Sequence, residues 1–325
     1  MCLEEFSNKV EKALMEHYGE EAQVRCQKVH KNNGVLLYGI CVMKKGKNIA
    51  PTIYLNDFYE LYEDGTTFGE VINDIIQMAE YYQVPHNINV DFFTDYNEIK
   101  QNLVLRLIHF EENIELLKEV PHRRFMDLAV VCHCIVESEE IGSGAILIRR
   151  EHMESWKIDE DTMFDDAFLN SPRKEPYRFM KMSDMLIELL AKVIIRRAHD
   201  LCEGDEEEEL DMVREVMERI EADIEERHLP MYVLTNQKRY MGASCILYPR
   251  ILEKIGNLLQ EDYYVIPSSI HEVLIIRESE SMESIDINRM IKEVNQTQVE
   301  QVEWLSNHTY FYNRDGKKLF PVTNS

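Results

Sequence analysis

Glycine is scarce in this chain, and its scarcity limits the folds and the sites that the sequence can form. Twelve of the 325 residues are glycine and nine are proline, which is about half the usual combined share of roughly 12%. This composition excludes collagen-like and low-complexity chains. The apolar share of 45% is sufficient for a globular core. We therefore expect an ordinary folded protein in which each glycine-containing loop can be tested in turn.

The glycine positions do not fit the common phosphate-binding loops. The one G-x-G is Gly142–Gly144, and Leu147 stands where the dinucleotide fingerprint requires its third glycine. Gly34 and Gly39 have the spacing of a P-loop, but Ile40-Cys41 replaces the Lys and the Ser or Thr that such a loop needs. The sequence therefore predicts no nucleotide site, and we expect no cofactor.

The charge of the chain argues against two classes of partner. With 36 basic and 60 acidic residues, the formal charge is −24, the opposite of the basic face that binds nucleic acid. The amino terminus lacks the features of a signal peptide, and no apolar run approaches the roughly 18 residues of a membrane span. Seven scattered cysteines indicate free thiols in a reducing compartment. We expect a cytoplasmic protein that binds neither nucleic acid nor membrane.

Hydrophobic periodicity predicts an α+β fold. Helical spacing predicts helices over residues 2–18, 56–62, 67–82, 151–169, 183–199, 206–227, 250–259 and 285–295. Short apolar or alternating runs predict strands over 24–30, 35–43, 50–55, 103–110, 128–136, 145–149, 232–235, 244–248, 263–266 and 273–276, followed by a hairpin around Asp315-Gly316.

One local pattern occurs three times, at residues 50–55, 145–150 and 243–248, where a strand that begins with Ala leads directly into a helix. It predicts antiparallel hairpin-plus-helix units in two α+β parts, residues 1–100 and 101–325. A helical hairpin would be inserted in the second part at about residues 177–228. The alternative is that such units arise by chance in any α+β protein.

Three further motifs do not support catalysis or metal binding. In Cys132-His133-Cys134 the two thiols would share one face of a strand and the imidazole would lie on the other, so we interpret them as buried cysteines and expect no metal site. Ser171–Lys174 matches S-x-x-K, but the segment resembles a loop before Pro176 and its companion motifs are absent. The acidic run Glu203–Glu209 is typical of a helix start.

The segment Pro267–Glu272 is the most suggestive constellation, because it lies between two predicted strands. Ser269 and His271 have the chemistry of a nucleophile and a base, and Glu272 could orient the imidazole. The alternative is a turn whose hydroxyl groups satisfy backbone groups. Further candidate binding residues are Ser268, Tyr232 and Asn236.

The chain also resembles a known family through motifs spread along its length, at residues 91–93, 125–131, 231–236, 242–243, 246–249, 267–272 and 293–295. It is similar to an uncharacterised domain-of-unknown-function family from anaerobic Gram-positive bacteria, over nearly the whole chain. The resemblance implies a bacterial cytosolic protein. That family has no assigned activity, cofactor or catalytic residue to carry over.

Two hypotheses for the function follow from the sequence. The first is a non-catalytic cytosolic binding or regulatory protein, whose acidic surface favours a basic protein or peptide partner. The second is a hydrolase that uses Ser269, His271 and Glu272.

Overall fold

The computed structural model describes residues 1–48, 50–82, 91–138, 142–201, 206–226, 231–267, 269–280 and 299–322. The chain divides into two compact units. The first consists of Met1–Leu103, Glu112–Pro121 and His133–Met163, and the second of Val104–Glu111, His122–Cys132 and Phe164–Ser325. The units alternate along the chain beyond residue 103, whereas the sequence-based division at residue 100 stays a prediction.

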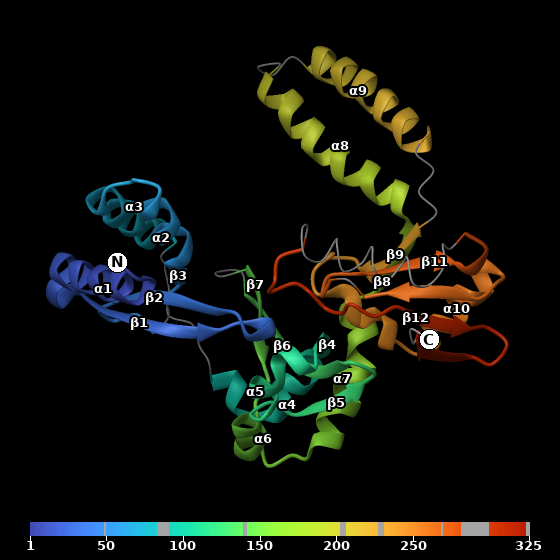
Figure 1. Cartoon of the computed structure of the whole chain (residues 1–325). Helices are drawn as coiled ribbons and strands as arrows, with labels where there is room; N and C mark the ends of the chain where they lie inside the picture. The colour runs from blue at the N-terminus through green and yellow to red at the C-terminus, as the bar shows by residue number, and fades with distance from the viewer. Residues whose placement is uncertain are drawn as a thin grey trace. The chain divides into compact units, whose positions relative to one another are not determined.

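In the first unit, the amino-terminal helices pack against a small antiparallel sheet (Figure 1). The strands lie in the order β1-β2-β3. The elements of this unit are α1 (Leu3–Tyr18), β1 (Ala22–His30), β2 (Leu36–Lys44), β3 (Thr52–Tyr54), α2 (Asn56–Glu63), α3 (Phe68–Tyr81), α4 (Tyr96–Ile99), α5 (Ile114–Leu117), β7 (Gly142–Leu147) and α6 (Arg150–Trp156).

The core of this unit follows directly from the helical spacing. Phe6, Val10 and Leu14 recur along one face of α1 and are fully buried against β2, β3 and α3. Helix α3 begins after Thr67, whose hydroxyl accepts a hydrogen bond from the Glu70 N–H while the Glu70 carboxylate accepts one from the Thr67 N–H. The predicted helices at 2–18 and 67–82 are therefore present.

The second unit is dominated by an antiparallel sheet in the order β13-β12-β10-β11-β9-β8. Its elements are β4 (Leu103–His109), β5 (His122–Phe125), α7 (Glu160–Lys174), β8 (Tyr177–Lys181), α8 (Met182–Leu201), α9 (Glu206–Glu226), β9 (Met231–Asn236), α10 (Ile251–Leu259), β10 (Tyr263–Ile266), β11 (Val273–Arg277), β12 (Tyr310–Asn313) and β13 (Lys318–Pro321). Strand β6 (Leu128–Ser138) pairs first with β5 and then with β7.

The α+β class and the antiparallel sheets predicted from the sequence are thus observed. Helices α8 and α9 form the expected helical hairpin, but residues 177–181 belong to strand β8, which pairs with β9. The predicted helix at 285–295 lies outside the described residues. None of the helices in the described part of the chain is both long enough and apolar enough to span a bilayer.

The predicted strand at 244–248 is wrong, because residues Gly242–Leu247 form a 3-10 helix. Residues 242–246 are all buried, and a fully buried run has no alternation to distinguish a strand from a helix. The third copy of the proposed repeat therefore lacks its second strand. The hairpin-plus-helix unit is seen at β2-β3-α2 and at β6-β7-α6.

The predicted loop at Ser171–Lys174 is also wrong, since this segment is the last turn of α7. Pro172 lies inside the helix, where it removes one backbone donor. The turn is closed by the Glu175 N–H, which donates to the Ser171 carbonyl at 2.9 Å. The buried Ser171 hydroxyl also donates to the Ala167 carbonyl at 2.6 Å.

Candidate functional site

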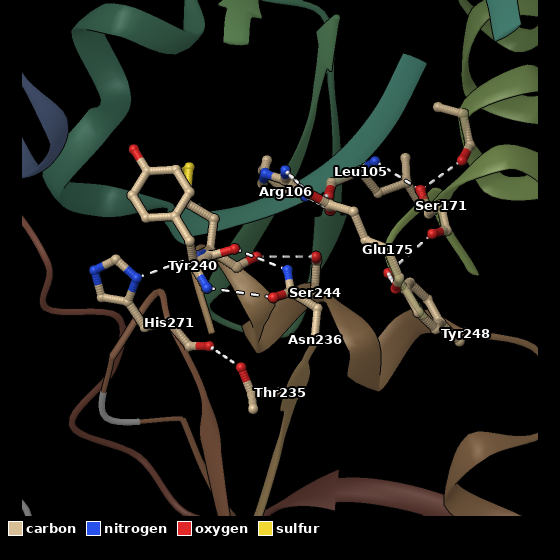
Figure 2. Close-up of polar contacts among 12 residues, drawn as sticks. Leu105, Arg106, Ser171, Glu175, Thr235, Asn236, Tyr240, Ser244, Tyr248 and His271 are labelled. Atoms are coloured by element: carbon tan, nitrogen blue, oxygen red, sulfur yellow. Dashed lines mark hydrogen bonds and ion pairs between the residues drawn. The ribbon is translucent and has the colours of Figure 1, made fainter. Parts of the chain in front are cut away.

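The segment that follows β9 and the segment that precedes β11 meet in the second unit (Figure 2). The pairing of β9 with β11 places Leu234 opposite Val273. Beyond these strands the Gly242 N–H donates to the His271 carbonyl at 2.9 Å, and the Ala243 N–H donates to the Ile270 carbonyl at 3.1 Å. Two residues chosen from the sequence, Asn236 and His271, are therefore brought together. We call residues 235–243 and 269–272 the polar junction.

Asn236 holds the 236–240 loop of the junction closed. Its fully buried side chain donates to the Tyr240 carbonyl at 2.8 Å and accepts from the Tyr240 N–H at 3.2 Å. The backbone of the loop is unusual, because Arg239 and Met241 have φ values of 54° and 50°. Side chains disfavour this left-handed region, so the surrounding hydrogen bonds must hold it. The backbone on both sides of Tyr240 is therefore held by hydrogen bonds within the protein.

Gly242 is required where this loop meets β9. A Cβ atom at this position would lie 2.3 Å from the Thr235 hydroxyl oxygen and 2.5 Å from the Asn236 amide nitrogen. Both distances are shorter than van der Waals contact, so only glycine fits without backbone movement. The Thr235 hydroxyl donates to the same His271 carbonyl at 2.8 Å, which fastens the two segments at this point.

Both ring nitrogens of His271 are engaged within the protein. Nδ1 accepts a hydrogen bond from the Met241 N–H at 3.1 Å, and Nε2 lies 3.1 Å from Oε1 of Glu303. A nitrogen that accepts carries no proton, so the ring proton lies on Nε2 and points to the Glu303 carboxylate. The imidazole fixes the loop on one side and an acidic side chain on the other.

Ser269 does not contact the imidazole ring of His271 through its hydroxyl group. Its oxygen accepts from the backbone N–H of His271 at 3.0 Å, the geometry of a serine turn. The residue is buried and forms an isolated bridge with Trp304. Ser269 therefore contacts the backbone of His271 within one turn. The contact between hydroxyl and imidazole that a nucleophile and its base require is not formed.

Glu272 belongs to the junction, whereas Tyr232 lies away from it on β9. Burial raises the pKa of Glu272, the neighbouring His271 opposes that rise, and Glu303 adds to it. Tyr232 is four residues before Asn236 on β9, which is about 13 Å along a strand. It stacks on Phe179 and accepts a hydrogen bond from Arg277 at 3.0 Å. Ser268 lies outside the described residues.

Tyr240 and Glu303 complete this site, and no sequence motif pointed to either residue. Tyr240 is 58% exposed, and its ring centroid lies 5.4 Å from that of His271. Glu303 is joined to the junction through its backbone, since the Ile270 N–H donates to the Glu303 carbonyl at 2.8 Å. An exposed aromatic ring and the Glu303 carboxylate therefore both lie beside the His271 imidazole.

A buried ion pair lies beside the junction, as Figure 2 shows. Arg106 on β4 forms a double hydrogen bond with Glu175, one arm of which measures 2.7 Å. The two side chains are 2% and 4% exposed. Tyr248 donates to the Glu175 carbonyl at 2.9 Å, and burial raises its pKa. These contacts connect β4, α7 and the 3-10 helix, and they leave no charge exposed for chemistry.

A second polar network surrounds Asp127. Its carboxylate accepts from the Ser306 hydroxyl at 2.7 Å, from the Tyr310 hydroxyl, and from Nδ1 of His308 at 3.1 Å. Burial alone would raise the pKa of Asp127, but these hydrogen bonds outweigh it and lower the pKa. The network attaches the 306–310 segment to the start of β6. Among the described residues, no three His, Cys, Asp or Glu side chains are arranged to hold a metal ion.

Comparison with known proteins places the chain in a family. A family model matches residues 3–314, nearly the whole chain. The chain belongs to DUF5688, a family of unknown function. The family-level resemblance noted in the sequence is thereby confirmed. No curated protein and no solved structure matches the chain.

Proposed function

We propose that the protein is a non-catalytic binding protein of the bacterial cytosol, and that its polar junction binds a basic segment of a protein partner. The observation that carries this proposal is the exposed Tyr240 ring beside His271, whose Nε2 faces the Glu303 carboxylate. A lysine or arginine side chain binds well where an aromatic face and carboxylates converge.

The rigidity of the loop favours recognition. Asn236 fixes the loop backbone on both sides of Tyr240, and His271 fixes the next residue, Met241. A loop backbone that is ordered before binding loses little conformational entropy when a partner arrives. Tyrosines of this kind are frequent among the residues that dominate binding energy at interfaces.

Long-range charge supports the same partner. The chain carries a formal charge of −24, and a strongly acidic surface raises the rate at which basic segments arrive. Specificity then has to come from the junction, because a diffuse charge attracts every polycation. The test must therefore separate the site from the overall charge.

Fluorescence anisotropy with a labelled peptide of alternating Lys and Arg makes that separation. We expect Tyr240→Ala and Glu303→Gln each to weaken binding by roughly tenfold or less, the size of a cation–π contact or a partly exposed ion pair. The matched controls are Tyr81→Ala, which removes an 81% exposed tyrosine of the first unit, and Glu115→Gln, which removes one exposed charge. Equal affinity of all four variants would contradict the proposal.

The hydrolase hypothesis is tested by labelling with a fluorophosphonate probe. Catalysis by Ser269 would require its hydroxyl to leave the His271 N–H and turn towards the imidazole. Nδ1 would also have to release the Met241 N–H or Nε2 the Glu303 carboxylate. We expect no labelling that depends on Ser269. If the probe labelled the wild type but not Ser269→Ala, the result would overturn the binding proposal and support the hydrolase hypothesis.

A further inference from the structure

Helix α8 carries more apolar surface than the one stripe that a hairpin needs. Two stripes run along it, and Leu189 and Ile195 outside them are also 40% and 49% exposed. The first contains the buried Ala198 and faces α9. Successive residues turn by about 100° around a helix, which places the second stripe roughly 100° from the first. The first stripe consists of Ile187, Ala191, Ile194 and Ala198, and the second of Leu186, Leu190 and Val193. In the second stripe Leu190 is 38% and Val193 60% exposed.

Helix α9 repeats this arrangement. Its main stripe contains Ile224, which is buried against α8, and the second is turned by roughly 90° in the same sense. Because α9 runs antiparallel to α8 (Figure 1), turns of the same sense bring both second stripes to the same side of the hairpin. The main stripe of α9 is Val213, Met217, Ile220 and Ile224, and the second is Met212 and Val216.

A helix with two apolar stripes at about a right angle is typical of a four-helix bundle, where each helix has two neighbours. Within the described residues α8 contacts mainly α9, with smaller contacts to β8 and β9. One hairpin therefore supplies half of such a bundle. The other half must present the same kind of face, also two helices wide.

The charges on the hairpin fit a second copy of itself. Lys192, Arg196 and Arg197 surround Val193 near the carboxyl end of α8, where they line a shallow depression. The sequence at the start of α9 is acidic, Glu206–Glu209. When two hairpins stack with their connecting loops at the same end, α8 of each copy lies antiparallel beside α9 of the other. The basic end of one helix then meets the acidic start of its new neighbour.

We propose that α8–α9 is a self-association element, through which two copies of the chain form an intermolecular four-helix bundle. The interface is isologous, as a two-fold axis requires. Helix α8 has 20 residues and is about 30 Å long, so a face two helices wide measures about 600 Å² in projection. That area is close to the roughly 800 Å² that each partner buries in a stable complex. This association is independent of the peptide site at Tyr240.

Sedimentation velocity of the full chain over a range of concentrations tests the dimer. We expect two copies of 38.5 kDa, or 77 kDa, at high concentration and the monomer on dilution. The double variant Leu190→Glu/Val193→Glu would place two charges in the interface between the hairpins. We expect it to weaken association by at least about 100-fold. The matched control is Leu258→Glu on α10, which is 67% exposed and should dimerise normally.

Charge reversal tests the arrangement of the helices. Arg196→Glu/Arg197→Glu should weaken the dimer by about tenfold, and adding Glu208→Lys/Glu209→Lys should restore it. Circular dichroism confirms that each variant is folded. A wild type that stays monomeric at every concentration, or a dimer that survives Leu190→Glu/Val193→Glu, overturns the proposal. Failure of the rescue overturns the antiparallel pairing of α8 with its neighbour.

Discussion

The polar junction and the α8–α9 hairpin belong to the same unit, yet they use their side chains in opposite ways. In the junction, the described hydrogen bonds of Asn236, His271 and Ser269 are all made within the chain. On the hairpin, apolar side chains such as Val193 and Leu210 remain 60% and 63% exposed. Internal hydrogen bonds give rigidity, whereas uncovered apolar area leaves free energy that a partner can gain. The two regions therefore suit two different kinds of binding.

The largest effect on stability should come from the buried ion pair that supports the junction. Glu175→Gln leaves the Arg106 guanidinium buried without its counter-charge, and we expect a loss of about 3–5 kcal/mol. Urea unfolding followed by circular dichroism measures it. The control, Glu115→Gln, lies at an exposed pair with Lys118 and should change little. If Glu175→Gln lowered the free energy of unfolding by less than about 1 kcal/mol, the ion pair would not be a main source of stability beside the junction.

The sequence could predict the regular elements of the first unit better than this ion pair. The spacing of Phe6, Val10 and Leu14 predicts α1, because a helix brings every third or fourth residue to one face. Arg106 is the only charged residue in the apolar run Leu103–Ile108, which signals a buried partner. Nothing in the pattern identifies Glu175, which is 69 residues away.

The sequence named Asn236 and the segment Pro267–Glu272 as candidates without predicting their contacts. The pairing of β9 with β11 brings their segments together. Periodicity cannot tell whether the Ser269 hydroxyl binds an imidazole or the nearest backbone N–H, since both lie within reach of a short turn. Tyr240 and Glu303 join the site through loop geometry, which no local pattern encodes.

A smaller effect is expected at Asp127, whose network resembles the junction in being internally satisfied. Asp127→Asn weakens three hydrogen bonds to a charged group, and we expect a loss of roughly 1.5–3 kcal/mol at pH 7. The pKa of Asp127 is lowered in the folded state, so its stabilisation is present above the unfolded pKa of about 3.9. That stabilisation is lost as pH falls through the folded pKa.

Unfolding curves of the wild type and Asp127→Asn at several pH values measure this dependence. The difference in stability between the two proteins should shrink below about pH 4, as Asp127 becomes protonated. A difference that instead grows below about pH 4 would reverse the assigned direction of the shift.

The contact between α8 and the sheet should contribute less. Glu188 on α8 accepts hydrogen bonds from Arg178 at 2.7 Å and from Arg239 of the junction. The Glu188 side chain is 40% exposed, so solvent screens these pairs. Arg178→Ala should cost less than about 1 kcal/mol in urea unfolding, because Arg239 remains. A loss above about 2 kcal/mol would mean that the hairpin depends on the sheet for its folding.

The smallest effect separates folding from association. Leu190→Gln replaces one partly exposed apolar side chain, and we expect a change within about 0.5 kcal/mol in monomer stability. The measurement uses the lowest practical protein concentration, where mass action favours the monomer. A large loss of monomer stability at that concentration would show that Leu190 belongs to the core of one chain. The hairpin would then not differ from the junction in leaving its surface open to a partner.

The tight fit at Gly242 has a consequence for genetics. An alanine there must displace the Thr235 hydroxyl or the Asn236 amide, while every side chain that the junction exposes stays chemically the same. Such a substitution strains the folded state and lowers its stability. The variant should therefore stay folded at a low temperature and unfold at a higher one. Gly242→Ala is therefore a rational design for a temperature-sensitive allele, in which a change of growth temperature turns one site off in living cells.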